Sequence, residues 1–95
     1  MIDINYELYK VFYHVASTLN FSEASKQLFI SQSAVSQSIK TLERKLDQTL
    51  FIRSTKKVQL TPEGEILMRH IEPAMNLIQK GEAQLLEAAS TGGQI

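Results

Sequence analysis

Apolar residues recur every three or four positions along the first part of the chain, the spacing that collects them on one face of an α-helix. This stripe predicts a helix over residues 6–18, with Asn5 as its N-terminal cap. A second, shorter helix is expected over residues 23–29, because Ser22 can accept hydrogen bonds from the free amides of its first turn. A tight break at residues 30–31 then separates this helix from the next.

The third predicted helix covers residues 32–46, has Ser31 as its cap, and presents two different faces. One face is apolar and consists of Val35, Ile39, Leu42 and Leu46. The other is polar near its start and basic further along, and it consists of Ser33, Ser36, Gln37, Lys40 and Arg44. Such a helix suits the major groove of DNA, but an ordinary amphipathic helix with a solvated polar face has the same pattern.

Two short apolar runs, at residues 50–53 and 58–60, predict the strands of a small hairpin. The connecting loop carries Lys56 and Lys57, and Arg53 lies at its base. Cations on a hairpin can contact a minor groove or the phosphates beside it, although a solvated hairpin tip has the same composition. Two helices, a tight turn and a basic hairpin in this order favour a DNA-binding domain.

A final helix is expected to open at Thr61, which can cap it, with Pro62 in the first turn where a missing N–H costs nothing. The helix is expected to reach about residue 89, and Pro73 is expected to bend it or force a local adjustment. Residues 90–95 then have the composition of a hinge.

Apolar residues of this last helix alternate in steps of four and three, as in the seam of a coiled coil. They are Leu67, Ile71, Ala74, Ile78, Gly81, Leu85 and Ala88. The stripe can pack on its own domain, but a helix of about 40 Å outreaches a core of about 65 residues. We therefore predict a homodimer whose interface includes Leu67, Ile71, Ala74, Ile78 and Leu85, and which presents two third helices to a near-palindromic site.

The 95-residue chain has 10 basic and 10 acidic residues, but the two signs are segregated. Residues 24–62 carry seven basic and two acidic side chains, a net charge of +5. The rest of the chain carries three basic and eight acidic side chains, a net charge of −5. A polyanion is therefore attracted to the middle of the chain and repelled by its ends.

Composition argues against several classes of protein. The chain has no cysteine, so disulfides, cysteine-containing zinc sites and thiol nucleophiles are excluded. Its longest apolar runs fall far short of the ~20 residues of a membrane span, and no signal-peptide pattern is visible. His14 and His70 have no companions at metal-ligand spacing. We expect a soluble cytoplasmic protein without enzymatic activity, metal or cofactor.

Two groups of residues are expected to contact DNA. The first reads base edges, because amide side chains pair with adenine and short hydroxyl side chains allow close approach; it consists of Gln32, Ser33, Ser36 and Gln37. The second holds the phosphate backbone with cations and with caps of helix N-termini; it consists of Ser22, Ser31, Lys40, Arg44, Arg53, Lys56 and Lys57.

The segment FSEASKQL at residues 21–28 and the segment SQSAVSQSI at residues 31–39 resemble the helix-turn-helix of LysR-type transcriptional regulators. The resemblance continues in register through Leu42-Glu43, through LFIR at residues 50–53 and through LTPEG at residues 60–64. It implies that the start of the third helix reads bases, that the hairpin is a wing on the DNA backbone or minor groove, and that the last helix dimerises. It also implies a further domain that binds a small-molecule effector.

Four positions depart from the pattern of that family. Ser33 stands where the family usually has proline, and Gln37 where it often has arginine, which shifts base preference away from guanine. Asp47 replaces a common glycine at a helix end, where a left-handed backbone costs it more. Ser25 replaces a small apolar residue and needs a hydrogen-bond partner if it is buried.

The chain is therefore expected to be mainly α. A winged helix-turn-helix of three helices and a two-stranded wing covers residues 1–61, a dimerisation helix covers residues 62–89, and residues 90–95 lead to an effector-binding domain. The expected function is sequence-specific regulation of transcription by a homodimer on double-stranded DNA. The alternative is a dimerising protein-interaction module on the same scaffold, which the neutral total charge also allows.

Overall fold

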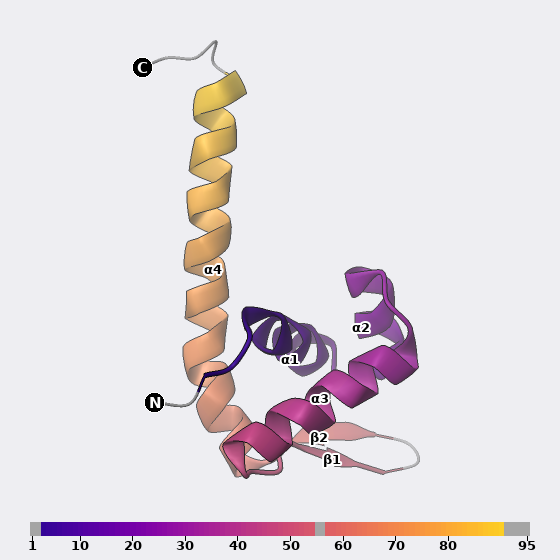
Figure 1. The fold of residues 1–95 in the computed structure, drawn as a ribbon. Coiled ribbons are helices and arrows are strands. Elements are labelled where there is room, and N and C mark those ends of the chain that lie inside the picture. The colour runs from indigo at the N-terminus through magenta and orange to yellow at the C-terminus, as the bar shows by residue number, and fades with distance from the viewer. Residues whose placement is uncertain (1–2, 55–56, 91–95) are drawn as a thin grey trace.

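The computed structural model describes residues 3–54 and 57–90. Its elements follow in the order α1 (Tyr6–Thr18), α2 (Phe21–Leu28), α3 (Gln32–Leu46), β1 (Phe51–Arg53), β2 (Val58–Leu60) and α4 (Pro62–Ser90). The first three helices gather beside the hairpin, and α4 extends away from them as a long rod (Figure 1). The predicted winged fold is confirmed, whereas the predictions for Lys56 and for a hinge beyond Ser90 lie outside the described residues.

Side-chain caps start the first three helices. Asn5 caps α1 by accepting a hydrogen bond from the Glu7 amide at 2.8 Å, as predicted. The prediction that Ser22 caps α2 is wrong: the cap is Asn20, whose side-chain oxygen accepts from the Glu23 amide at 2.9 Å. Both residue types cap helices well, so the choice depends on where the chain leaves α1. Ser22 consequently lies inside the first turn of α2.

Each of these three helices ends on a residue with a left-handed backbone: Leu19 (φ 51°), Phe29 (φ 58°) and Asp47 (φ 54°). The left-handed conformation predicted to be costly at Asp47 is present, and its amide donates to the Arg44 carbonyl at 3.2 Å. Such residues reverse the chain within a few positions. They therefore keep the connections short and hold α1, α2 and α3 at fixed angles.

The core lies where these helices meet the hairpin. Its buried apolar residues are Val11, Phe12, Val15, Ala16, Ala24, Val35, Ile39, Leu42, Leu50 and Phe51. The predicted apolar face of α3 is confirmed, since its first three members have no exposed surface and Leu46 packs against the cluster. Burial of each large side chain contributes about 1.5–3 kcal/mol. Ser25 is also buried, and its hydroxyl donates to the Ser22 carbonyl at 2.7 Å, so the polar group is satisfied.

The hairpin is tied to both of its neighbouring helices. Strands β1 and β2 are antiparallel, with Phe51 opposite Leu60. On the α3 side, the Glu43 carboxylate accepts hydrogen bonds from the amides of Leu50 at 2.7 Å and Phe51 at 3.3 Å. On the α4 side, Thr61 donates its hydroxyl hydrogen to the Thr49 carbonyl at 2.6 Å and caps the helix by accepting from the Gly64 amide at 2.9 Å. The wing is therefore fixed relative to α3.

Helix α4 has a packed part and an exposed part, and it continues through Pro73. Leu67 and Ile71 are half-buried against the domain's own core, and Met75 is 5% exposed. Leu67 and Ile71, which were predicted for a dimer seam, thus also contact the domain that they belong to; the seam itself stays a prediction. Every described side chain over residues 76–89 is exposed. None of the helices in the described part of the chain is long and apolar enough to cross a membrane.

Candidate nucleic-acid interface

The start of α3 presents the four predicted base-reading residues on the surface. Gln32, Ser33 and Gln37 are exposed, and Ser36 is half-buried. None of them belongs to the core, because the buried face of α3 consists of other residues. The geometry on which major-groove reading depends, a protruding polar face at the beginning of a helix, is therefore present.

The first turn of α3 is held in place by Ser31. Its hydroxyl oxygen accepts a hydrogen bond from the Ala34 amide at 3.1 Å, and it lies 3.1 Å from the Ser33 hydroxyl oxygen. Ser31 is exposed, as is Ser33. A capped N-terminus directs free amides and the positive end of the helix dipole toward solvent, where a phosphate can bind.

Four residues of α3 line a shallow hollow of about 490 Å³: Ser33, Ser36, Gln37 and Lys40. The lining combines two short serine side chains with a longer amide and a cation. Arg44 is exposed one turn beyond Lys40. Short residues near the base edges and long cations further along the helix match the usual division between base contacts and phosphate contacts.

Arg53, at the end of β1, does not project freely from the wing. Its guanidinium carbon lies 4.1 Å from the centre of the Phe21 ring. One of its terminal nitrogens donates a hydrogen bond to the Ser36 hydroxyl oxygen at 2.7 Å. At an exposed site such a cation–π contact contributes about 0.5–1 kcal/mol. Arg53 therefore connects the wing to the first residue of α2 and to the reading face of α3.

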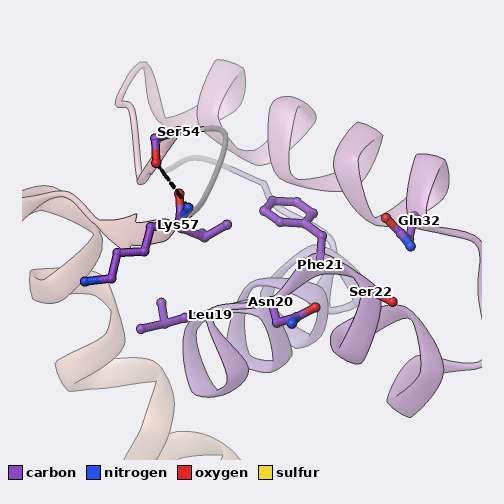
Figure 2. Close-up of a pocket in the computed structure, with 8 residues that line it drawn as sticks. Leu19, Asn20, Phe21, Ser22, Gln32, Ser54 and Lys57 are labelled. Carbon is purple, nitrogen blue, oxygen red and sulfur yellow. Dashed lines mark hydrogen bonds between the residues drawn. The ribbon is translucent and has the colours of Figure 1, made fainter.

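A second, larger groove of about 630 Å³ separates the wing from α2. Its lining residues are Leu19, Asn20, Phe21, Ser22, Gln32, Ser54, Lys57 and Val58. Figure 2 shows the Phe21 ring between the first turn of α2 and the ribbon of α3, with Ser22 and Gln32 on one side of it and Lys57 on the other. Residues predicted separately as base contacts and as backbone contacts thus line one concave surface.

Ser54 and Lys57 close the described part of the wing. The Ser54 hydroxyl donates to the Lys57 carbonyl at 3.2 Å and accepts from the Lys57 amide at 3.1 Å, and the Ser54 amide donates to the same carbonyl at 2.9 Å. These bonds fix the backbone of Lys57 while its side chain stays exposed. A cation on an ordered backbone loses less freedom when it binds a phosphate.

Sequence reasoning missed two residues of this surface, Asn20 and Phe21. Asn20 aligns α2 through its cap, and Phe21 supports Arg53. A signal for Asn20 was present, because asparagine is among the best N-cap residues and Glu23 follows three positions later. The contact between Phe21 and Arg53 joins distant parts of the chain, so no local pattern indicates it.

Comparison with known proteins gives a consistent result. The sequence pattern described as "bacterial regulatory helix-turn-helix protein, lysR family" matches residues 6–65. The HTH-type transcriptional regulator PerR of Escherichia coli is 43% identical over 76 residues, which are 80% of this chain and 26% of that protein. The chain thus spans about a quarter of the length of the curated relatives that it matches.

Solved structures agree with the sequence comparison. Vibrio fischeri DarR, in a structure described as a complex with DNA, has a TM-score of 0.74 and 27% identity, and the match covers 96% of this chain and 31% of that one. The CbnR DNA-binding domain in its DNA complex also has a TM-score of 0.74, with 26% identity, covering 90% of this chain and 99% of that one.

Proposed function

The chain belongs to the LysR family of bacterial helix-turn-helix regulatory proteins, and on that basis we propose that it binds double-stranded DNA in a sequence-specific manner to regulate transcription. One observation carries the proposal. The polar start of α3 is exposed beside a wing that is hydrogen-bonded to the same helix. Relatives of the same fold have been solved on DNA, which supports this use of the surface.

We assign two roles within this interface. Gln32, Ser33, Ser36 and Gln37 contact base edges in the major groove, because they are the short or amide-bearing residues at the start of α3. The phosphate contacts come from serines at the starts of α2 and α3 and from the cations around them: Ser22, Ser31, Lys40, Arg44, Arg53 and Lys57. Ser22 contributes here as part of the first turn of α2 rather than as its cap.

The base-reading role is tested with Gln37→Ala and with Gln79→Ala as its control, since Gln79 is an exposed glutamine on the distal part of α4. A target is first selected from a random duplex library. Gln37→Ala is expected to weaken binding to this target by about 1–3 kcal/mol and to leave binding to random duplex unchanged. Equal losses on both duplexes would remove the base-reading role, and the control is expected to change neither affinity.

The phosphate-binding role is tested with Lys57→Ala and with Lys80→Ala as its control. Removal of a cation that binds a phosphate is expected to weaken binding to every duplex alike. It also reduces the slope of log affinity against log salt concentration by about 1. A salt dependence identical to that of the parent chain would contradict a phosphate contact at Lys57.

The exposed apolar residues of α4 support a homodimer. Ile78 is 42% exposed and Leu85 is 74% exposed, and Ala74 lies on the same side of the helix one turn before Ile78. Leu67 and Ile71 are already occupied by the domain's own core, so the interface that we propose is the distal part of the predicted seam. A twofold dimer of this kind would present two α3 helices to a near-palindromic site.

Light scattering of Ile78→Glu against the parent chain and against Gln79→Glu tests the dimer. Ile78→Glu places a charge in the apolar seam and is expected to halve the mass, while the polar-to-charged control leaves it unchanged. An unchanged mass for Ile78→Glu would refute this interface.

We assign the activity to the cytoplasm, where the bacterial chromosome lies, and assign no reaction to the chain, in keeping with relatives named as transcriptional regulators.

A further inference from the structure

The contact between Arg53 and Ser36 determines which hydrogen-bonding groups Ser36 offers to DNA. A free serine hydroxyl has one hydrogen to donate and two lone pairs to accept with, so it matches either a donor or an acceptor on a base. Here the guanidinium of Arg53 donates to the hydroxyl oxygen at 2.7 Å. One lone pair is therefore occupied, and a fixed positive charge lies beside the oxygen.

The hydroxyl hydrogen of Ser36 is left available by the rest of the helix. Other hydroxyl side chains in helices donate to a carbonyl of the preceding turn: Thr41 to Gln37 at 2.9 Å, and Thr18 to His14 at 2.8 Å. Among the described residues, the bond from Arg53 is the one that the Ser36 hydroxyl makes. Ser36 thus accepts from within the protein and keeps its donor free, in a hollow on the reading face of α3.

Phe21 keeps Arg53 in this position. The ring supports the guanidinium from one face at 4.1 Å, and it is itself packed edge-on against Phe51 of β1, with ring centres 6.3 Å apart. The planar group can then present its edge to Ser36 without searching many rotamers. A lysine has no planar group to stack or to direct in this way.

We propose that Arg53 is a positioning residue for base recognition, and that it makes Ser36 a hydrogen-bond donor that selects keto bases, guanine or thymine, in the major groove. The inference rests on the proposed DNA-binding function. Guanine presents O6 and N7 as acceptors and thymine presents O4, whereas cytosine presents only an amino donor and adenine presents its N7 acceptor beside an amino donor. The adjacent cation polarises the hydroxyl, which strengthens donation to an acceptor, and it repels an approaching amino group. A guanine or thymine preference at this position is opposite to the adenine preference expected of Gln37.

The experiment selects bound duplexes from a random library with the parent chain, Ser36→Ala, Arg53→Gln and the double variant. The parent is expected to select one base pair at one position of each half-site. Replacing its keto base by an analogue that lacks the keto oxygen is expected to weaken binding, whereas removing the amino group of the paired base is not. Ser36→Ala is expected to lower this preference by about tenfold at that position alone. Arg53→Gln is expected to lose the same preference. The double variant is expected to lose no more of this preference than either single variant does, because one residue acts through the other.

Further variants separate positioning from a structural or phosphate-binding role. Ser36→Thr, which keeps the hydroxyl, is expected to retain the preference, while Arg53→Lys, which keeps the charge, is expected to lose it. Circular dichroism checks folding, and if Arg53→Gln fails to fold, Phe21→Leu replaces it and is expected to weaken the same preference. If the Arg53 variants keep the base preference and lose affinity for all duplexes to the same extent, the inference is overturned.

The outcomes also separate this inference from the proposed function. A parent chain that selects no motif refutes sequence-specific binding itself. Two results refute only the role assigned to Ser36 and Arg53: a selected motif in which no position responds to Ser36→Ala, or a responding base pair at which binding depends on the amino group rather than on the keto oxygen.

Discussion

The two ends of α4 differ in how they are stabilised. Near its start, Gly64 is buried, Leu67 and Ile71 pack against the core, and Met75 accepts a hydrogen bond from the Tyr6 hydroxyl at 3.7 Å. Further along, residues 76–89 belong to the same continuous helix, yet all of their described side chains are exposed. Three leucines in this part are 68–74% exposed: Leu77, Leu85 and Leu86.

This difference shows that helix formation and tertiary stabilisation are separate matters in this chain. An isolated helix shorter than about 12–15 residues is marginal in water, and most helical stability in proteins comes from packing of one face. The start of α4 has such a face against its own domain. The distal part exposes Leu77, Ile78, Leu85 and Leu86, which is the physical reason for expecting a second copy of the chain there.

The largest expected effect separates the core, against which the start of α4 packs, from the distal part of α4. Phe12 has no exposed surface and touches Phe51, with ring centres 5.4 Å apart. Phe12→Ala is expected to lower the free energy of unfolding by about 3–5 kcal/mol, because it leaves a cavity in the core. Leu85→Ala, measured by denaturant unfolding at a concentration where the chain is monomeric, is expected to change it by less than about 0.5 kcal/mol. Equal losses would show that distal α4 packs on the domain.

A smaller loss of stability is expected when the Glu43 carboxylate, which joins α3 to the hairpin, is removed. Glu43→Ala removes the acceptor for the amides of Leu50 and Phe51 in a half-buried place. The expected loss is about 1–3 kcal/mol in the free energy of unfolding, because buried amides are left unsatisfied. Glu82→Ala, in the exposed part of α4, is the control and is expected to have almost no effect. Calorimetry measures the unfolding midpoint of each variant, and equal midpoints for the two would contradict this role for Glu43.

The two glycines of α4 are expected to respond with opposite signs. A Cβ on Gly64 would collide with the Leu50 carbonyl oxygen and would lie 2.8 Å from the Leu60 side chain, so Gly64→Ala is expected to destabilise the fold by about 1–3 kcal/mol. A Cβ on Gly81 would meet nothing within 4 Å, so Gly81→Ala is expected to stabilise the helix by about 0.5–1 kcal/mol. Thermal unfolding of both variants checks the signs; a loss for Gly81→Ala would indicate a close partner there.

The smallest effect is expected at the end of α3. Asp47 has a φ of 54°, which glycine adopts without strain, so Asp47→Gly is expected to raise the free energy of unfolding by about 0.5–1 kcal/mol. Gln48→Gly is the control: Gln48 is exposed and is not among the residues with positive φ, so this change only adds freedom to the unfolded chain. Denaturant titration measures the free energy of unfolding of both variants. A higher value for Gln48→Gly than for Asp47→Gly would contradict the expectation.

Much of the fold was predictable because its signals are local. The bounds of α1 and α3, the caps Asn5 and Ser31, and the buried face of α3 agree with the structure. Each depends on the spacing of apolar residues within one helix or on a hydrogen bond between residues two or three positions apart. The misplaced cap of α2 marks the limit of this reasoning, since two good capping residues lie two positions apart and only the path out of α1 selects Asn20.

The sequence by itself determined the bounds of α1 and α3, which face of α3 is apolar, and that the cations gather in the middle of the chain. Only the tertiary structure decided that Leu67 and Ile71 belong to the domain's own core, and that Arg53 rests on Phe21 and bonds to Ser36. Periodicity shows that a side chain faces an apolar surface, but it does not say whose surface it is. Contacts between residues distant along the chain depend on the angles at which the helices pack, and the packing of the whole core sets those angles.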